Sequence, residues 1–295
     1  MPNLIIIGTG PAGISAALYT VRSGIKTTVI GRDTGSLEKT DKIENYYGFE
    51  EPITGKALSE NGILQAKRLG AEVIIDEVVS LDYKYDKNFF IVKTKLNEYN
   101  ADSVILATGI ARNTPKTKGL KELEGKGVSY CAVCDGFFYK GKDVTVLGDG
   151  EYALHEASEL LPIVKSVTLL TDGKELSNDI KVKIDKDIKI NTKEISAFSG
   201  EKVLEKVEFK DNTILLTSGV FVALGVASSS NLARKLGAQV DGTKIVVDSN
   251  MSSNIPGLYA AGDCTGGMLQ VAKAVYEGAK AGTEAVKFLR SISKK

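Results

Sequence analysis

The sequence has 295 residues, of which 43% are hydrophobic, and its formal net charge is +1. This length accommodates two domains with their own cores, and the near-zero charge excludes a general attraction to nucleic acid or to an anionic membrane surface. No apolar run reaches the length of a membrane span, and the apolar N-terminus stops at a glycine turn instead of a cleavage site. We therefore expect a globular, cytoplasmic protein.

The chain opens with a pattern of strand, glycine turn and helix. A β-branched run at residues 3–7 leads into Gly8, Gly10 and Gly13, which have the spacing GxGxxG. The first glycine of this motif permits a tight turn, the second lets a pyrophosphate approach the backbone, and the third lets the helix pack on the strand. Because a further strand is expected at residues 26–30, the motif has the context that dinucleotide binding requires.

The acidic residue that often holds the adenosine ribose is missing after this second strand, where Gly31 and Arg32 follow. Arg32 contacts the adenosine or lies in a solvated loop, and the sequence leaves both readings open. The next elements are expected to be a helix within residues 51–76, a strand at 72–75, strands at 78–85 and 89–95, and a strand at 103–106 closed by Thr108 and Gly109.

Two cysteines separated by two residues, Cys131 and Cys134, indicate a redox centre. CxxC spacing lowers the pKa of a thiol toward neutrality, and Asp135 directly after it is placed to move a proton to or from a leaving thiolate. A structural zinc site needs four ligands, but the chain offers only Cys264 and His155 in addition. A redox pair is therefore favoured over a metal site, and we expect no metal. Cys264 is expected to be a small core residue.

The first pattern recurs after the cysteines in a shorter form. It consists of a strand at residues 143–147, a GxGxxA turn at Gly148, Gly150 and Ala153, a helix at 154–161, a strand at 166–170, and residues 221–225 that echo residues 105–109. This second unit is of the nucleotide-binding type. A run of lysines between residues 181 and 193, interrupted by aspartates, is expected to be the solvated face of a strand.

The C-terminal part contains strands at 244–247 and 255–263, the second ending in Gly262 and Asp263, and a helix at 268–290. Small residues recur along this helix and permit close packing against a partner or a cofactor, while burial of a plain core helix explains its alanines equally well.

Four motifs in order carry a resemblance to a known family: the first GxGxxG, the central CAVCDGFF, the GxGxxA turn, and IPGLYAAGD at residues 255–263. Together they resemble the low-molecular-weight thioredoxin reductase family of FAD flavoproteins, over nearly the whole chain. The resemblance implies a cytoplasmic homodimer with an α/β fold of two Rossmann-like, three-layer ββα domains, the second inserted into the first. The FAD-binding domain would comprise residues 1–112 and 246–295, and the domain with the cysteines residues 113–245.

The resemblance also implies roles for individual residues. Cys134 would face the flavin, Cys131 would attack the disulfide of thioredoxin, and Asp135 would donate the proton. The residues implied to bind FAD are Gly8, Gly10, Pro11, Ala12, Gly13, Gly31, Arg32, Asn45, Val78, Thr108, Gly109, Gly262, Asp263, Gln270 and Val271.

The sequence departs from the NADPH-using members of this family. Those members follow the second glycine turn with a histidine and clustered arginines that bind the 2′-phosphate, whereas residues 171–177 contain no arginine and one lysine. Asp149 and Glu151 place two carboxylates in the turn that would hold a pyrophosphate, where like charges oppose binding. The familiar Gly-Gly-Gln is replaced at residues 36–39, and Leu269 stands where an arginine is common. These changes resemble the pyridine-nucleotide-independent, ferredoxin-dependent flavin thioredoxin reductases.

We therefore expect a thioredoxin-disulfide reductase that takes electrons from ferredoxin through FAD and the two cysteines. Three alternatives stay open. Asp172 lies near the usual offset for an acid that binds a ribose 2′-hydroxyl, which would suit an NADH-dependent reductase, and an NADPH-dependent reductase is its variant. A dithiol oxidase would keep FAD and the cysteines and pass electrons to oxygen. A non-enzymatic flavin sensor would have no need of Asp135.

Overall fold

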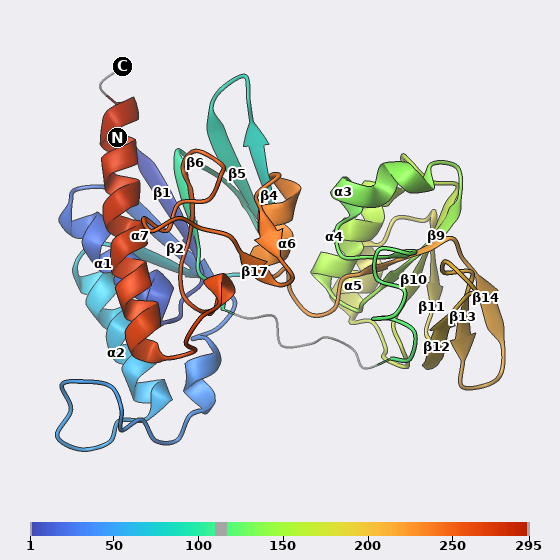
Figure 1. The fold of residues 1–295 in the computed structure, drawn as a ribbon, viewed down its shortest axis with the longest axis horizontal. Helices are drawn as coiled ribbons and strands as arrows, with labels where there is room; N and C mark the ends of the chain where they lie inside the picture. The colour runs from blue at the N-terminus through green and yellow to red at the C-terminus, as the bar shows by residue number, and fades with distance from the viewer. Residues whose placement is uncertain (1, 110–116, 294–295) are drawn as a thin grey trace. The chain divides into compact units, whose positions relative to one another are not determined.

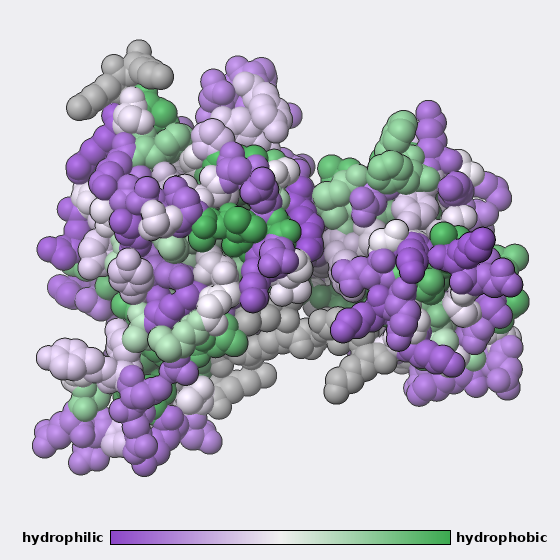
Figure 2. All heavy atoms as spheres, in the orientation of Figure 1, coloured by the Kyte–Doolittle hydropathy of each residue, from purple (hydrophilic) through white to green (hydrophobic). Residues whose placement is uncertain are grey.

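The computed structural model describes residues 2–109 and 117–293. The chain packs as two compact units, the first formed by residues 1–111 with 228–295 and the second by residues 112–227. Both units carry a mainly hydrophilic surface with small apolar patches (Figure 2). Within the described residues, no helix combines the length and the apolar character that crossing a bilayer requires.

The second crossing between the units lies earlier than the sequence suggested. The return to the first unit was expected at residues 245–246, but residues 228–245 already pack with that unit. Here α6 (Ser229–Lys235) contacts β4 (Val78–Lys84) and β17 (Lys244–Ile245), which the sequence pattern did not reveal. The outward crossing expected at 112–113, with Pro115, lies outside the described residues.

The first unit is built on a parallel sheet in the order β18-β7-β1-β2-β3. Its strands are β1 (Asn3–Ile7), β2 (Lys26–Gly31), β3 (Glu72–Ile75), β7 (Ser103–Leu106) and β18 (Leu258–Ala260). The helices α1 and α7 pack against this sheet, and an antiparallel meander contacts β1 and β7, so that three layers result (Figure 1). The remaining elements are α1 (Pro11–Arg22), η1 (Ser36–Lys39), α2 (Gly55–Arg68), the meander β4, β5 (Phe89–Thr94) and β6 (Glu98–Ala101), the pair β16 (Val240–Asp241) and β17, η3 (Asp263–Thr265) and α7 (Val271–Ile292).

The small residues of α7 serve its packing on α1. A Cβ atom on Gly278 would lie 2.0 Å from the carbonyl oxygen of Ala12, and one on Gly282 would lie 2.7 Å from that of Ala16. Ala281 and Ala285 of α7 are fully buried in the same core. The small stripe is therefore a helix–helix contact, and it presses α7 against the start of α1, where the first glycine turn lies (Figure 1).

The second unit repeats the first on a smaller scale. Its parallel sheet has the order β11-β10-β9-β15-β8, in which β9 pairs with β10 and β15 just as β1 pairs with β2 and β7. Its strands are β8 (Val128–Ser129), β9 (Asp143–Leu147), β10 (Ser166–Leu170), β11 (Ile188–Asn191), β15 (Gly219–Val222) and the antiparallel β12 (Ile195–Ser199), β13 (Lys206–Phe209) and β14 (Ile214–Leu216). Its helices are α3 (Ala132–Asp135), η2 (Gly136–Tyr139), α4 (Glu151–Leu160) and α5 (Asn178–Lys183).

The two units share a backbone conformation at the glycine that follows corresponding strands, in addition to the similarity of their sequences. Gly109 after β7 and Gly225 after β15 have φ angles of +72° and +71°, a conformation that favours glycine. The lysines of the run are exposed, as expected, but they do not form the face of one strand, because Lys181 and Lys183 lie on α5 and Lys189 lies on β11.

Candidate functional site

The first glycine turn forms an open cradle at the N-terminus of α1. Gly8 has φ +125°, and a Cβ atom there would lie 2.2 Å from the carbonyl oxygen of Ala107. A Cβ on Gly13 would lie 1.9 Å from the carbonyl oxygen of Gly8, so both positions require glycine. Gly10, in contrast, has nothing within 4 Å of its Cβ position. The glycine loop is thus tightly packed at Gly8 and Gly13 and open at Gly10. The first turn of α1, which follows the loop, contains no acidic residue.

Further predicted cofactor residues lie at the carboxyl end of the same sheet. Gly31 ends β2, where a Cβ would lie 2.6 Å from Thr9 Oγ1. Arg32 pairs with its neighbour Asp33 at 3.2 Å, and both side chains are exposed. Val78 is buried at the start of β4. Gly31 and Arg32 therefore lie at the carboxyl end of β2, and Val78 starts the meander three residues after the end of β3.

Asp76, which the sequence reading missed, lies just after β3 at this edge. Its side chain is 7% exposed, and its Oδ1 accepts the N–H of Glu77 at 2.7 Å. Its Oδ2 is buried and meets no hydrogen-bond partner among the described residues. A buried acceptor of this kind suits a hydrogen-bond donor of a ligand, and it directly follows the third strand, β3.

Thr108 and Gly109, after β7, are tied to α6. The backbone N–H of Thr108 donates to Ser229 Oγ at 3.2 Å, and the N–H of Ser229 donates to Thr108 Oγ1 at 3.0 Å. This reciprocal pair fixes the turn at the point where the chain leaves the first unit.

Residues that are far apart in the chain meet at the start of α7. Asn45 Nδ2 donates to Gln270 Oε1 at 2.8 Å, and Val271 is the first residue of the helix. A Cβ on Gly262 would lie 2.9 Å from that of Ala12, which follows Pro11 at the first turn of α1. The structure thus brings the first glycine turn, the Gly-Asp turn and the Asn45–Gln270 pair into one unit.

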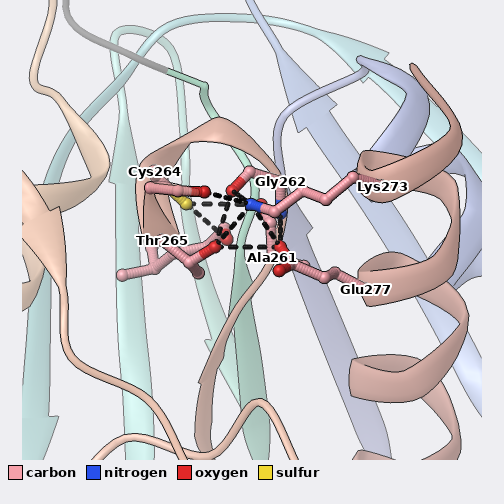
Figure 3. Close-up of polar contacts among 8 residues, drawn as sticks. Ala261, Gly262, Cys264, Thr265, Lys273 and Glu277 are labelled. Atoms are coloured by element: carbon pink, nitrogen blue, oxygen red, sulfur yellow. Dashed lines mark hydrogen bonds and ion pairs between the residues drawn. The ribbon is translucent and has the colours of Figure 1, made fainter. Parts of the chain in front are cut away.

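A part-buried ion pair of α7 clamps the Gly-Asp turn (Figure 3). Lys273 Nζ donates to the carbonyl oxygens of Gly262 at 2.8 Å and Gly266 at 2.6 Å, and to Thr265 Oγ1 at 2.9 Å. It also pairs with Glu277 Oε2 at 2.8 Å, and this oxygen accepts the N–H of Gly262 at 2.8 Å. The two side chains are only 13% and 12% exposed.

Asp263 lies inside the loop that this clamp holds, as the first residue of η3. Neither Lys273 nor Glu277 was expected from the sequence to act here. Their i, i+4 spacing at the start of a helix, directly after a Gly-Asp pair, is the signal that was available.

The redox pair lies in the second unit. Cys131 and Cys134 are joined in a disulfide, and Cys131 is the N-cap of α3 and only 3% exposed. Ser129 Oγ donates to Asp135 Oδ2 at 2.7 Å and accepts the N–H of Cys131 at 3.1 Å. One hydroxyl therefore links the carboxyl group of Asp135 to the backbone of the first cysteine. Burial, and then the charge of Asp135, raises the pKa of Tyr139.

Exposed apolar side chains lie within and just after the CxxC segment in the sequence. Val133, Phe137 and Phe138 are 50%, 73% and 71% exposed on α3 and η2.

Cys264, in the first unit, is 1% exposed, and burial raises the pKa of its thiol to about 11, so it is a core thiol that stays protonated at neutral pH. Within the described parts of the chain, no group of three His, Cys, Asp or Glu side chains is placed to hold a metal ion.

The second glycine turn carries its own counterions. Lys174 Nζ pairs with Asp149 Oδ2 at 2.8 Å, and Lys183 Nζ pairs with Glu151 Oε1 at 2.6 Å. Asp172 Oδ1 accepts the N–H of Ile195 at 2.7 Å, which anchors the start of β12. The second turn therefore differs in charge from the first, whose helix has no acidic residue in its first turn.

The first unit fits the FAD that the resemblance implies. Its first glycine turn leaves open space above Gly10, α1 has no acid in its first turn, and the edge of the sheet carries the buried Oδ2 of Asp76. These features suit a phosphate at a helix N-terminus and a hydrogen-bond donor beyond it.

Comparisons with known proteins agree with this architecture. Residues 2–278 match the model of the family described as pyridine nucleotide-disulphide oxidoreductase. The thioredoxin reductase of Peptoclostridium acidaminophilum is 35% identical over 308 residues, covering 98% of this chain and 97% of its own. The crystal structure of the atypical thioredoxin reductase TRi from Desulfovibrio vulgaris Hildenborough is 41% identical, with a TM-score of 0.93 and 99% of both chains covered. A ferredoxin-flavin thioredoxin reductase from Clostridium acetobutylicum is 33% identical, with a TM-score of 0.70 and 98% of both chains covered.

Proposed function

The chain belongs to the pyridine nucleotide-disulphide oxidoreductase family, among its FAD-binding thioredoxin reductases, and from this premise we propose that it reduces thioredoxin with electrons from a reduced ferredoxin. The observation that carries the choice of donor is the charge at the second glycine turn. Its two carboxylates, Asp149 and Glu151, are paired with Lys174 and Lys183.

The ion pairs matter through their net charge and not through their strength. Both lysines are more than 40% exposed, and such pairs contribute only about 0–1 kcal/mol to stability. A pyrophosphate that enters the turn nevertheless meets four groups whose charges cancel, where a binding site would present a positive field. If the lysines turn toward the ligand, the carboxylates remain beside it and repel it.

A nicotinamide cofactor also lacks its usual partners here. A 2′-phosphate is normally met by charge-assisted hydrogen bonds worth about 1.5–3 kcal/mol each. The absence of arginine between residues 171 and 177 removes at least two such bonds, about 3–6 kcal/mol, or roughly two to four decades of affinity. Asp172, the residue that would suit NADH, already uses Oδ1 on the N–H of Ile195.

Ferredoxin is an energetically sufficient donor. A ferredoxin near about −400 mV and a thioredoxin near about −270 mV differ by roughly 130 mV, which for two electrons is about 6 kcal/mol downhill. The similarity to a protein described as a ferredoxin-flavin thioredoxin reductase supports this choice.

We assign the roles of the chain's own residues as follows. The first glycine turn, the Asn45–Gln270 pair and the clamped turn around Asp263 would hold FAD, which supplies the means to collect single electrons and deliver them in pairs. In the reduced protein, the Cys131 thiolate attacks the disulfide of thioredoxin. Cys134 then attacks the mixed disulfide and releases reduced thioredoxin, and Asp135 provides the proton for the leaving thiolate. The working form would be a homodimer, with residues 1–111 and 228–295 as the FAD-binding domain.

The test is an anaerobic comparison of donors on the purified yellow protein. We expect millimolar NADPH or NADH to leave its visible absorbance unchanged, and catalytic ferredoxin with a reducing system to bleach it and to support thioredoxin reduction. Omission of ferredoxin from the same reducing system is the control. Steady-state thioredoxin reduction with a micromolar KM for either nicotinamide would restore the ordinary reductase. Failure of both donors, with rapid oxygen uptake on adding a small dithiol, would indicate the oxidase.

A further inference from the structure

Glu156 is a buried carboxylate that the proposed function does not use. It lies on α4 with 1% of its surface exposed, although a buried glutamate carries a large desolvation cost unless it is hydrogen-bonded. Such a residue in the core of the domain that contains the redox pair calls for a physical reason.

The contact that Glu156 makes points to the cysteines. Its Oε2 accepts the backbone N–H of Ala132 at 2.7 Å. Ala132 is the first residue of α3, is 1% exposed, and directly follows Cys131, the N-cap of that helix. The Sγ of Cys131 in turn accepts the N–H of Cys134 at 3.2 Å. The carboxylate is thus bonded to the peptide group that joins the first cysteine to the rest of the CxxC turn.

A negative charge at this place acts on the dithiol more than on the disulfide. The reactive form of the dithiol is a thiolate, and a nearby like charge disfavours it, whereas the disulfide is neutral and is affected little. A dithiol whose thiolate is stabilised belongs to an oxidising protein, and the converse makes the dithiol a stronger reductant. Asp135, the carboxylate directly after Cys134, accepts the hydroxyl of Ser129 at 2.7 Å.

We propose that Glu156 is a positioning residue whose negative charge, partly compensated by the Ala132 N–H that it accepts, lowers the reduction potential of the Cys131–Cys134 disulfide. The proposal rests on the proposed function only for its purpose, which is to make the dithiol a strong electron donor. Its chemistry is thiol–disulfide exchange with a dithiol reagent. The S–S bond of the protein breaks and gains two electrons and two protons, while dithiothreitol loses them and closes its own disulfide.

The experiment measures the equilibrium constant of this exchange in the purified holoprotein. The protein is equilibrated anaerobically in mixtures of reduced and oxidised dithiothreitol, quenched with acid, denatured and labelled with a maleimide polymer, so that free thiols are counted as mass shifts. Cys264 contributes a constant background of one thiol. We expect Glu156→Gln to raise the equilibrium constant for reduction about tenfold, which is about 30 mV for a two-electron couple. The readout needs neither ferredoxin nor a nicotinamide. The proposal for Glu156 can therefore be refuted while the proposed function holds, and the proposed function can be refuted while the proposal for Glu156 holds.

Two matched variants separate charge at this place from other effects. Glu159→Gln removes a carboxylate from the same helix, but one that is 42% exposed and pairs with His155, and it should change the constant less than twofold. Ala132→Pro keeps the carboxylate and removes the N–H that it binds. Proline is tolerated at the first position of a helix, and Cys131 before it has the extended backbone, φ −151° and ψ 107°, that proline requires of its predecessor.

Because the charge is then less compensated, Ala132→Pro should lower the equilibrium constant at least threefold, opposite to Glu156→Gln. A change of less than threefold in Glu156→Gln, or an equal change in Glu159→Gln, would overturn the proposal. If Glu156→Gln does not fold, as judged by its thermal unfolding, Ala132→Pro decides alone, and an unchanged or raised constant in that variant refutes the role of the charge.

Discussion

Substitution of Gly10 by glutamate should abolish FAD binding and leave the fold intact. Gly10 has φ −72° and ψ −179°, which any residue adopts, and nothing lies within 4 Å of its Cβ position. The side chain therefore enters open space without strain. Gly10 is also the N-cap of α1, where a negative charge is stabilising by about 0.3–1 kcal/mol, so the free energy of unfolding of the apoprotein should change by about 1 kcal/mol or less.

The loss of affinity follows from Coulomb's law. A carboxylate about 4 Å from a phosphate charge costs roughly 4 kcal/mol at an effective dielectric constant of about 20. One such interaction weakens binding by about three decades, and the second charge of a pyrophosphate adds to this. Gly10→Ala adds bulk without charge and should lose much less affinity.

The assay is the ratio of flavin to protein absorbance after purification, followed by fluorescence titration of the apoprotein with FAD and by thermal unfolding. The matched control is Gly150→Glu, the corresponding change in the second glycine turn, where the nearest atom to the Cβ position is 3.6 Å away. It should retain FAD fully. A yellow Gly10→Glu protein with normal flavin content would refute the assignment, and equal loss of flavin in both variants would point to general damage.

Three further outcomes are expected. Lys273→Met should weaken FAD binding by at least tenfold in a titration of the apoprotein, because the turn loses the hydrogen bonds of the ammonium group and Glu277 keeps a charge without its partner; for a fully buried pair this costs about 3–5 kcal/mol, and for this part-buried pair less. Lys273→Met combined with Glu277→Gln should recover part of the lost affinity. Wild-type affinity in the single variant would contradict the clamp. Cys131→Ser should show a long-wavelength charge-transfer band, which arises from the Cys134 thiolate beside oxidised FAD. Cys134→Ser should lack this band. The reverse pattern would mean that the two cysteines have exchanged roles. The raised pKa of Cys264 keeps its thiol protonated in the folded state, whereas the thiol ionises in the unfolded state above its ordinary pKa. The free energy of unfolding should therefore fall by about 2–3 kcal/mol as the pH rises from 9 to 11. Denaturant titrations of Cys264→Ala should not show this fall.

The sequence predicted the repeated strand–turn–helix units because their signals are local. Gly13 is required by the carbonyl oxygen of Gly8 in the same turn, and strand β9 was expected at the residues where it forms. The order of the parallel strands is the same in both units. The first strand of the pattern lies in the middle of its sheet, with β1 between β2 and β7 and β9 between β10 and β15.

Other features could not be predicted because they depend on distant contacts. The position of α6 is fixed by the reciprocal bonds between Ser229 and Thr108, which are 121 residues apart. The lysine run looked like a strand face because its spacing is short, but Ser177 caps α5 by accepting the N–H of Ile180. The role of Glu156 depends on a bond to Ala132, on a different helix, and no local pattern indicates it.

The two glycine turns occupy corresponding places in the two units. Both place a glycine N-cap at the start of a helix, Gly10 for α1 and Gly150 for α4, and each unit has a glycine of positive φ after a neighbouring strand, Gly109 after β7 and Gly225 after β15. What differs is the first turn of the helix, which has no acid in α1 and has Glu151 in α4. An anion site needs the unopposed partial positive charge of the helix N-terminus, and a carboxylate there takes its place. On the proposed function, the second turn would hold no nucleotide, and α4 would act on the cysteines through Glu156 instead.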